Sequence, residues 1–152
     1  MHDSSGRAFY VVGGFGFGAP GEEVYYANVW KFDVHALRWS QLQLKGPGVF
    51  KERNRCQLAL IDQTTLMVHG GNLFENHHDI FLGDVTLVDL NTGSVKLPPN
   101  LEHGTGAARC VGHHALIPTN NPRAWLIHGG ENGVKRFADI LVLSVEARPA
   151  EI

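Results

Sequence analysis

The stretch LMVHGG, residues 66–71, is an apolar segment of strand-like composition that ends in two glycines. Two other versions of it are FYVVGG at residues 9–14 and AWLIHGG at residues 124–130, so that successive double glycines lie 57 and 59 residues apart. Glycine permits positive φ angles and a close approach of neighbouring backbone that a Cβ atom would obstruct. An internal period of this length is typical of a repeat protein in which each repeat is one supersecondary unit.

A second segment recurs after each double glycine, as NVWKFD (28–33), DVTLVD (84–89) and DILVLS (139–144). Its alternating apolar residues predict a strand in each repeat. Six residues after the end of the first copy the chain has Trp39, and the same offset from the second copy reaches Val95.

The segments before the second and third double glycines also resemble each other. They read RCQLALID from Arg55 and RCVGHHALI from Arg109, which makes Cys56 and Cys110 equivalent core positions on this alignment. Agreement at several offsets predicts three units of the same antiparallel design.

This combination resembles the kelch repeat, which has an Arg-led first strand, a second strand ending in Gly-Gly, a third strand bounded by Asn or Asp, and a later tryptophan. The resemblance covers about residues 7–145 and implies that each repeat is a four-stranded blade of a β-propeller. The expected fold class is therefore all-β, a kelch-type propeller with about three blades.

The resemblance places blade one at about residues 7–44 without its first strand, blade two at 55–97, and blade three at 109–147 without a clear fourth strand. The whole of residues 1–152 would then be a partial propeller. The expected strands are Ala8–Val12, Asn28–Asp33 and Arg38–Leu42; Gln57–Ile61, Thr65–His69, Asp84–Asp89 and Ser94–Leu97; and Gly112–Ile117, Ala124–His128 and Asp139–Val145.

Three blades are too few for a closed ring, because propellers usually have 4 to 8 blades. Neighbouring blades from a longer chain, or self-association of this one, are expected to complete the ring. Within the chain, Trp39 is expected to be buried between blades one and two.

Gly16, Gly18 and Gly21 have the GxGxxG spacing of a dinucleotide-binding loop. That loop requires a helix at its end, because helix N-terminal amides hold the phosphate. The following residues alternate as in a strand, so these glycines are interpreted as turn residues in the loop between the second and third strands.

Composition excludes several functions. The net charge of −2 and pI of about 6.5 argue against a nucleic-acid partner, and no apolar run is long enough for a membrane helix. Two cysteines are too few for a disulfide framework, which favours a cytoplasmic, or else nuclear, location.

Histidines raise the alternative of a metal site. His77 and His78 lie near Glu75 and Asp79, and such ligands bind zinc or iron, although adjacent residues rarely converge on one ion. The histidines at positions 69 and 128 replace a valine of repeat one, Val12, and are interpreted as packing residues. No catalytic residue, metal or cofactor is therefore expected; the alternative is a metal-dependent enzyme of the oxidase or specifier type that uses the histidine-containing loops.

The resemblance implies a non-catalytic protein–protein interaction module, a scaffold or substrate receptor, that binds a protein partner through loops at the propeller mouth. Aromatic and arginine side chains on loops are typical of interface hot spots. The candidate contact residues are Tyr25, Tyr26, Phe50, Phe74, Arg53, Arg55, Arg109 and Arg136.

Overall fold

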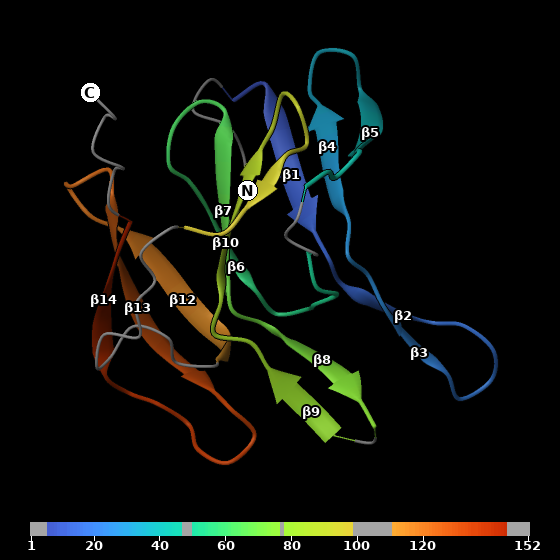
Figure 1. The fold of residues 1–152 in the computed structure, drawn as a ribbon, viewed down its shortest axis with the longest axis vertical. Helices are drawn as coiled ribbons and strands as arrows, with labels where there is room; N and C mark the ends of the chain where they lie inside the picture. Colours follow the sequence, from blue (N-terminus) through green and yellow to red (C-terminus); the bar gives the residue numbers. More distant parts are fainter. Residues whose placement is uncertain (1–5, 47–49, 77, 99–110, 146–152) are drawn as a thin grey trace.

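The computed structural model describes residues 6–46, 50–76, 78–98 and 111–145, and in these ranges the protein is all-β. Three antiparallel sheets lie one after another along the chain, and two hairpins extend from one end of them (Figure 1). The described ranges contain no helix that could cross a membrane.

Each sheet is a set of neighbouring antiparallel strands. The first has the order β1 (Ala8–Val12), β4 (Val29–Asp33), β5 (Arg38–Leu42). The second has the order β11 (Val95–Lys96), β10 (Val85–Asp89), β7 (Thr65–His69), β6 (Gln57–Leu60). The third has the order β12 (Gly112–Pro118), β13 (Ala124–Glu131), β14 (Ile140–Ser144).

The predicted strand positions are confirmed. Nearly every strand begins and ends within one residue of its predicted bounds, and β1, β5 and β7 have the predicted bounds. The exception is β13, which continues through its double glycine to Glu131, because Gly129 and Glu131 still pair with β12.

Two hairpins occupy segments that the sequence predicted as loops. They are β2 (Phe15–Phe17) with β3 (Glu23–Tyr25), and β8 (Asn72–Glu75) with β9 (His78–Phe81). Gly16 is therefore a strand residue, whereas Gly21 with a φ of 85° lies in the turn. Each hairpin continues the strands of its sheet after a double glycine with positive φ angles.

The double glycine also makes room for the next repeat. A Cβ atom at Gly13 would clash with the backbone carbonyl oxygen of Arg53, and one at Gly70 would lie 2.5 Å from the carbonyl oxygen of Val111. The amides of Gly14 and Gly71 donate hydrogen bonds to these same two carbonyls, at 2.7 and 2.8 Å. The glycines are thus needed where one repeat meets the backbone of the following one.

These contacts correct the alignment of the repeats. Arg53 and Val111 are equivalent, which makes Arg55 the counterpart of His113, and both residues have a positive φ, 54° and 56°. Cys56 then corresponds to His114, and the alignment of Arg55-Cys56 with Arg109-Cys110 was wrong. Residues 109 and 110 lie outside the described ranges.

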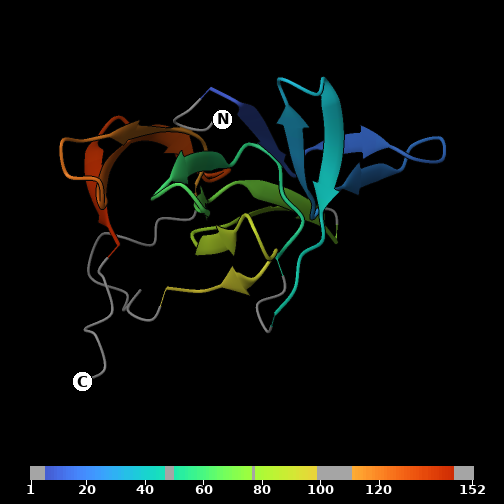
Figure 2. The same cartoon turned by 90° about the horizontal axis from the view of Figure 1, so that it is seen from above.

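The second sheet lies between the other two, and both of its faces are buried (Figure 2). Alternate residues of a strand point to opposite faces, so Leu66 and Val68 pack toward the first sheet while Met67 packs toward the third. The first interface contains Ala8, Tyr10, Val12, Val29, Phe50, Leu66, Val68, Val88 and Val95. The second contains Ala59, Met67, Val85, Trp125, Ile127 and Leu143.

The prediction that Trp39 is buried between the first two repeats is wrong, because this side chain is 51% exposed. Trp39 pairs across the sheet with Phe32, which pairs with Phe9, and the three side chains share the face turned away from the second sheet. Alternation along β5 leaves Leu42 to pack toward the second sheet instead.

Candidate functional site

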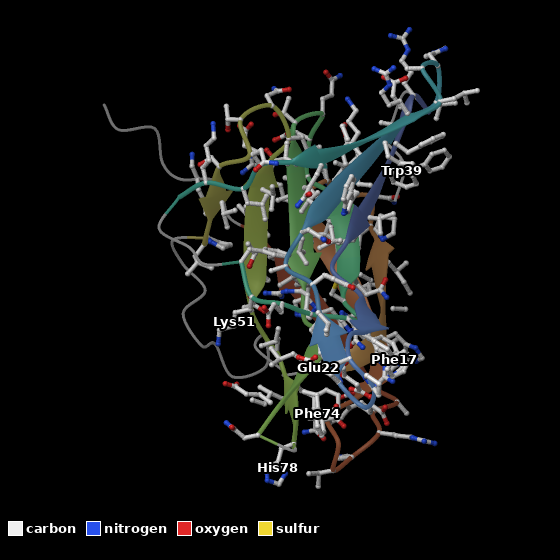
Figure 3. The ribbon with its side chains drawn as sticks, turned by 90° about the vertical axis from the view of Figure 1, so that its right-hand side faces the viewer. Phe17, Glu22, Trp39, Lys51, Phe74 and His78 are labelled. Carbon is white, nitrogen blue, oxygen red and sulfur yellow. The ribbon has the colours of Figure 1, made fainter. Side chains whose placement is uncertain are left out.

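The connections between the second and third strands of each repeat gather at one end of the molecule. The β2–β3 hairpin, the β8–β9 hairpin and the turn after β13 all lie at the lower end in Figure 1, and the β4–β5 turn lies at the upper end. The two hairpins touch through β3 and β8. Phe17, Glu22, Phe74 and His78 are at this lower end in Figure 3, far from Trp39.

Aromatic side chains cover the first hairpin. Phe17 is 76% exposed, and Phe15 is 47% exposed. Phe15 stacks on Tyr25 with ring centroids 5.9 Å apart and meets Phe17 edge to face at 6.0 Å. Tyr26 is also exposed, and its hydroxyl lies over Gly16, where a Cβ atom would come within 3.1 Å of it.

Tyr25 lies where the two hairpins and Arg55 come close. Its hydroxyl donates a hydrogen bond to Glu23 at 3.1 Å. Burial raises the pKa of the Tyr25 phenol; the hydrogen bond and charge of Glu23 and the charge of Asp79 raise it further, whereas Arg55 lowers it. Asp79 belongs to the second hairpin and accepts a hydrogen bond from the Asn72 side chain at 2.9 Å.

Four carboxylates lie on the same two segments, 15–26 and 72–81, and neither segment contains a lysine or arginine. We call the aromatic and acidic side chains of the two hairpins the hairpin surface. It consists of Phe15, Phe17, Tyr25, Tyr26, Phe74, Glu22, Glu23, Glu75 and Asp79. Tyr25, Tyr26 and Phe74 were predicted from the sequence as contact residues, and Phe74 is 43% exposed.

Arg53 and Phe50 were predicted as contact residues too, but the structure buries both side chains. The Arg53 guanidinium donates to both Asp84 carboxylate oxygens, at 2.9 and 2.8 Å, and to the Gly70 carbonyl at 3.1 Å. It also lies 4.7 Å from the ring centre of Phe50. These contacts fix the segment before β6 against the ends of β7 and β10, so Arg53 and Phe50 are left out of the hairpin surface.

The electrostatics of this pair are those of a structural ion pair. Burial opposes ionisation of Asp84, but the hydrogen bonds and charge of Arg53 outweigh it and hold the pKa of this carboxyl below its usual range. Thr86 adds a hydroxyl hydrogen bond to Asp84 at 3.1 Å. The pair is therefore charged at neutral pH.

Arg136 lies apart from the hairpin surface, in the turn after β13. Its Nε is 3.5 Å from Glu131 Oε2, and Glu131 Oε1 is 3.6 Å from His113 Nε2. With Gly130 and Phe137 these side chains line an open hollow of about 400 Å³. Arg55 is exposed beside the hairpins, and Arg109 lies outside the described ranges.

The sequence did not predict a buried imidazole pair between the second and third sheets. His69 Nδ1 and His114 Nε2 are 2.8 Å apart, and the side chains are 0% and 3% exposed. Burial lowers the pKa of each imidazole from 6.5 to about 4. His69 is a packing residue, as predicted, but the same prediction is wrong for His128, which is exposed because its side chain lies on the face of the third sheet turned away from the second. The corrected alignment provides the missing signal for the pair, since Val12 and Cys56 occupy the equivalent positions at the first interface.

A metal site gains no support here. In the part of the chain that the structure describes, no three His, Cys, Asp or Glu side chains converge where an ion could bind. His78 is exposed, and Asp79 is engaged by Asn72. His77 lies outside the described ranges.

In comparisons with known proteins, no family model and no curated protein matches this sequence. The function proposed for the chain rests on its own residues.

Proposed function

We propose that this chain is a non-catalytic protein-interaction module, a scaffold or substrate receptor built as part of a kelch-type β-propeller. The propeller interpretation is supported by three repeats that each form an antiparallel sheet, and by the stacking of consecutive sheets through apolar faces. The double glycines stand where each repeat meets the backbone of the next.

The hairpin surface is the observation that carries the binding function. Large aromatic side chains on a soluble protein normally pack inside, and their clustering at one end costs hydration free energy unless a partner covers them. Aromatic groups are also the side chains that contribute most to protein interfaces. Short hairpins position these groups more firmly than loops would, because paired strands hold the backbone.

The negative charge of the hairpin surface favours a partner with basic side chains. The hairpin surface combines five aromatic rings with four carboxylates, so it suits a protein segment with apolar and basic side chains. Lysine and arginine can pair with the carboxylates and also lie over the faces of aromatic rings. An acidic segment would be repelled.

Truncating one exposed ring on each hairpin tests the proposal. Peptides selected from a phage-displayed library for binding to the 152-residue chain would be synthesised, and their affinity measured by fluorescence anisotropy. The variant with Phe17→Ala and Phe74→Ala is expected to bind them at least about tenfold more weakly, because hot-spot truncations cost about 1–2 kcal/mol or more.

The control is Leu37→Ala, which removes another exposed apolar side chain at the opposite end and is expected to leave affinity unchanged. Selected peptides are expected to be enriched in lysine and arginine. Selection of acidic peptides, or equal binding by the double variant, would show that the hairpin surface is not the binding site.

A further inference from the structure

The two outer sheets turn apolar faces away from the second sheet. We call them the front face, on the first sheet, and the back face, on the third. The front face carries Phe9, Val11, Trp30, Phe32 and Trp39, and the back face carries Ala115, Ile117, Leu126, Ile140 and Val142. Exposure reaches 51% at Trp39 on the front face and 61–62% at Val142 and Ile140 on the back face.

Strand register shows that the back face is equivalent to a buried face of the second sheet. A row of paired residues crosses it as Ile117, Leu126 and Val142. The row at the same distance from the double glycine in the second sheet is Ala59, Met67 and Leu87, and it packs against the third sheet. Met67 is fully buried there, so the back face repeats a surface that a neighbouring sheet covers in this same molecule.

The front face is equivalent to the other face of the second sheet, the one that the first sheet covers. Its row Phe9, Phe32 and Trp39 occupies the positions of Leu66, Val88 and Val95 in the second sheet. That second-sheet row is at most 2% exposed, because the first sheet covers it. Trp39 is thus the equivalent of a buried core valine, but no sheet in the described residues covers it.

We infer that the front face of one copy of this chain packs against the back face of another copy. Two contacts of this kind already exist within the chain. The back-type surface of the first sheet packs on the front-type surface of the second sheet, and the back-type surface of the second sheet packs on the front-type surface of the third. Each copy therefore presents both halves of an interface that the repeat itself forms.

Shape supports this pairing. Val11, Trp30 and Trp39 line an open apolar hollow of about 440 Å³ on the front face. The back face offers protruding aliphatic side chains, with Ile140 and Val142 among the most exposed apolar residues described. The contact is heterologous, since two different surfaces meet, and such contacts close into rings or extend into chains.

The inference goes beyond the proposed peptide-binding function, because neither face includes a residue of the hairpin surface. Sedimentation equilibrium of the intact 152-residue chain over a wide concentration series is expected to show species of at least twice the 16.7 kDa chain mass. Val11→Asp on the front face and Val142→Asp on the back face are each expected to shift the chain toward monomer. Val11 is 47% exposed and Val142 is 61% exposed, so both variants are expected to keep the circular dichroism spectrum of the parent chain.

Mixing the two variants distinguishes a front-to-back contact from symmetric ones. An equimolar mixture is expected to regain a 1:1 complex, because the intact back face of Val11→Asp can meet the intact front face of Val142→Asp. The control Val134→Asp places the same charge on a residue that is 94% exposed in the turn after β13, and it is expected to associate like the parent chain.

Three results would overturn the inference. One is a monomeric parent chain at every concentration. Another is loss of association in only one of the two variants, which would indicate a front-to-front or back-to-back contact. The third is an equimolar mixture that stays monomeric although each variant alone is folded.

Discussion

Replacing Asp84 with alanine is expected to lower the free energy of unfolding by about 3 kcal/mol, because breaking a buried ion pair leaves the other charge uncompensated. Arg53 is completely buried, and Asp84 is its only carboxylate partner among the described residues. Among the residues that the structure describes, the guanidinium would keep only the carbonyl groups of Gly70 and Lys51 as hydrogen-bond acceptors. Urea denaturation followed by circular dichroism measures the loss.

Glu52→Ala is the matched control, since it removes an exposed carboxylate next to Arg53 in the sequence and is expected to change stability little. The double variant Arg53→Met with Asp84→Leu is expected to recover part of the loss, because it removes the buried charge as well as its partner. A loss below about 1 kcal/mol in Asp84→Ala would place this pair with the weak surface ion pairs and contradict its structural role.

Acidification is expected to destabilise the protein through the imidazole pair. Burial lowers the pKa of His69 and His114 to about 4, whereas the unfolded chain takes up protons near 6.5. The unfolded state therefore binds more protons between these values, so stability is complete above about pH 6.5 and falls as the pH decreases toward 4. Between about pH 6.5 and pH 5 the expected loss is about 2 kcal/mol for each imidazole that stays neutral in the folded state.

Burial and the neighbouring charged groups together set the low pKa values of the imidazole pair. Besides the partner imidazole, the charged groups that influence His69 are Asp84, which favours its protonation, and Arg53, which opposes it. A proton on the accepting ring would also turn the hydrogen-bond acceptor of the 2.8 Å contact into a second donor. Desolvation is the largest cause and outweighs the attraction of Asp84.

The first interface supplies a matched control for the second. His69→Val with His114→Cys copies the equivalent pair Val12 and Cys56, and it is expected to abolish most of the pH dependence above pH 5. His128→Val removes the exposed histidine that stands at the same place in the third repeat, and it is expected to leave the pH dependence intact. Equal pH dependence in the parent chain and the double variant would assign the effect to other groups.

The strands could be predicted because their signals are local. Alternating apolar residues, a double glycine and a bounding Asn or Asp recur at a constant spacing, and backbone pairing needs little more than this to place β1, β7 and β13. The hairpins β2–β3 and β8–β9 were missed because their strands are only three or four residues long and carry glycine or charged residues that read as loop. Two of the predicted contact residues, Tyr25 and Phe74, lie on these hairpins, and Tyr26 directly follows β3.

Errors arose where a side chain's role depends on which face it occupies. The sequence predicted Trp39 to be buried between the first two repeats, whereas strand alternation turns it to the opposite face of the first sheet. It predicted Arg53 as a contact residue on a loop, without revealing that Asp84 would pair with it. The shared Arg-Cys pair favours an alignment of Arg55 with Arg109, but only the backbone contacts between repeats show that His113 is the counterpart of Arg55.

By itself the sequence determined the repeat, its period and the positions of the strands, since these follow from residue spacing and from the conformational freedom of glycine along one stretch of backbone. The tertiary structure alone decided which apolar faces are covered and which charges are paired. It also decided that two histidines 45 residues apart share one hydrogen bond. The reason is that burial is a property of the partner surface as well as of the strand, so equivalent rows of apolar residues are core in the second sheet and exposed on the first and third.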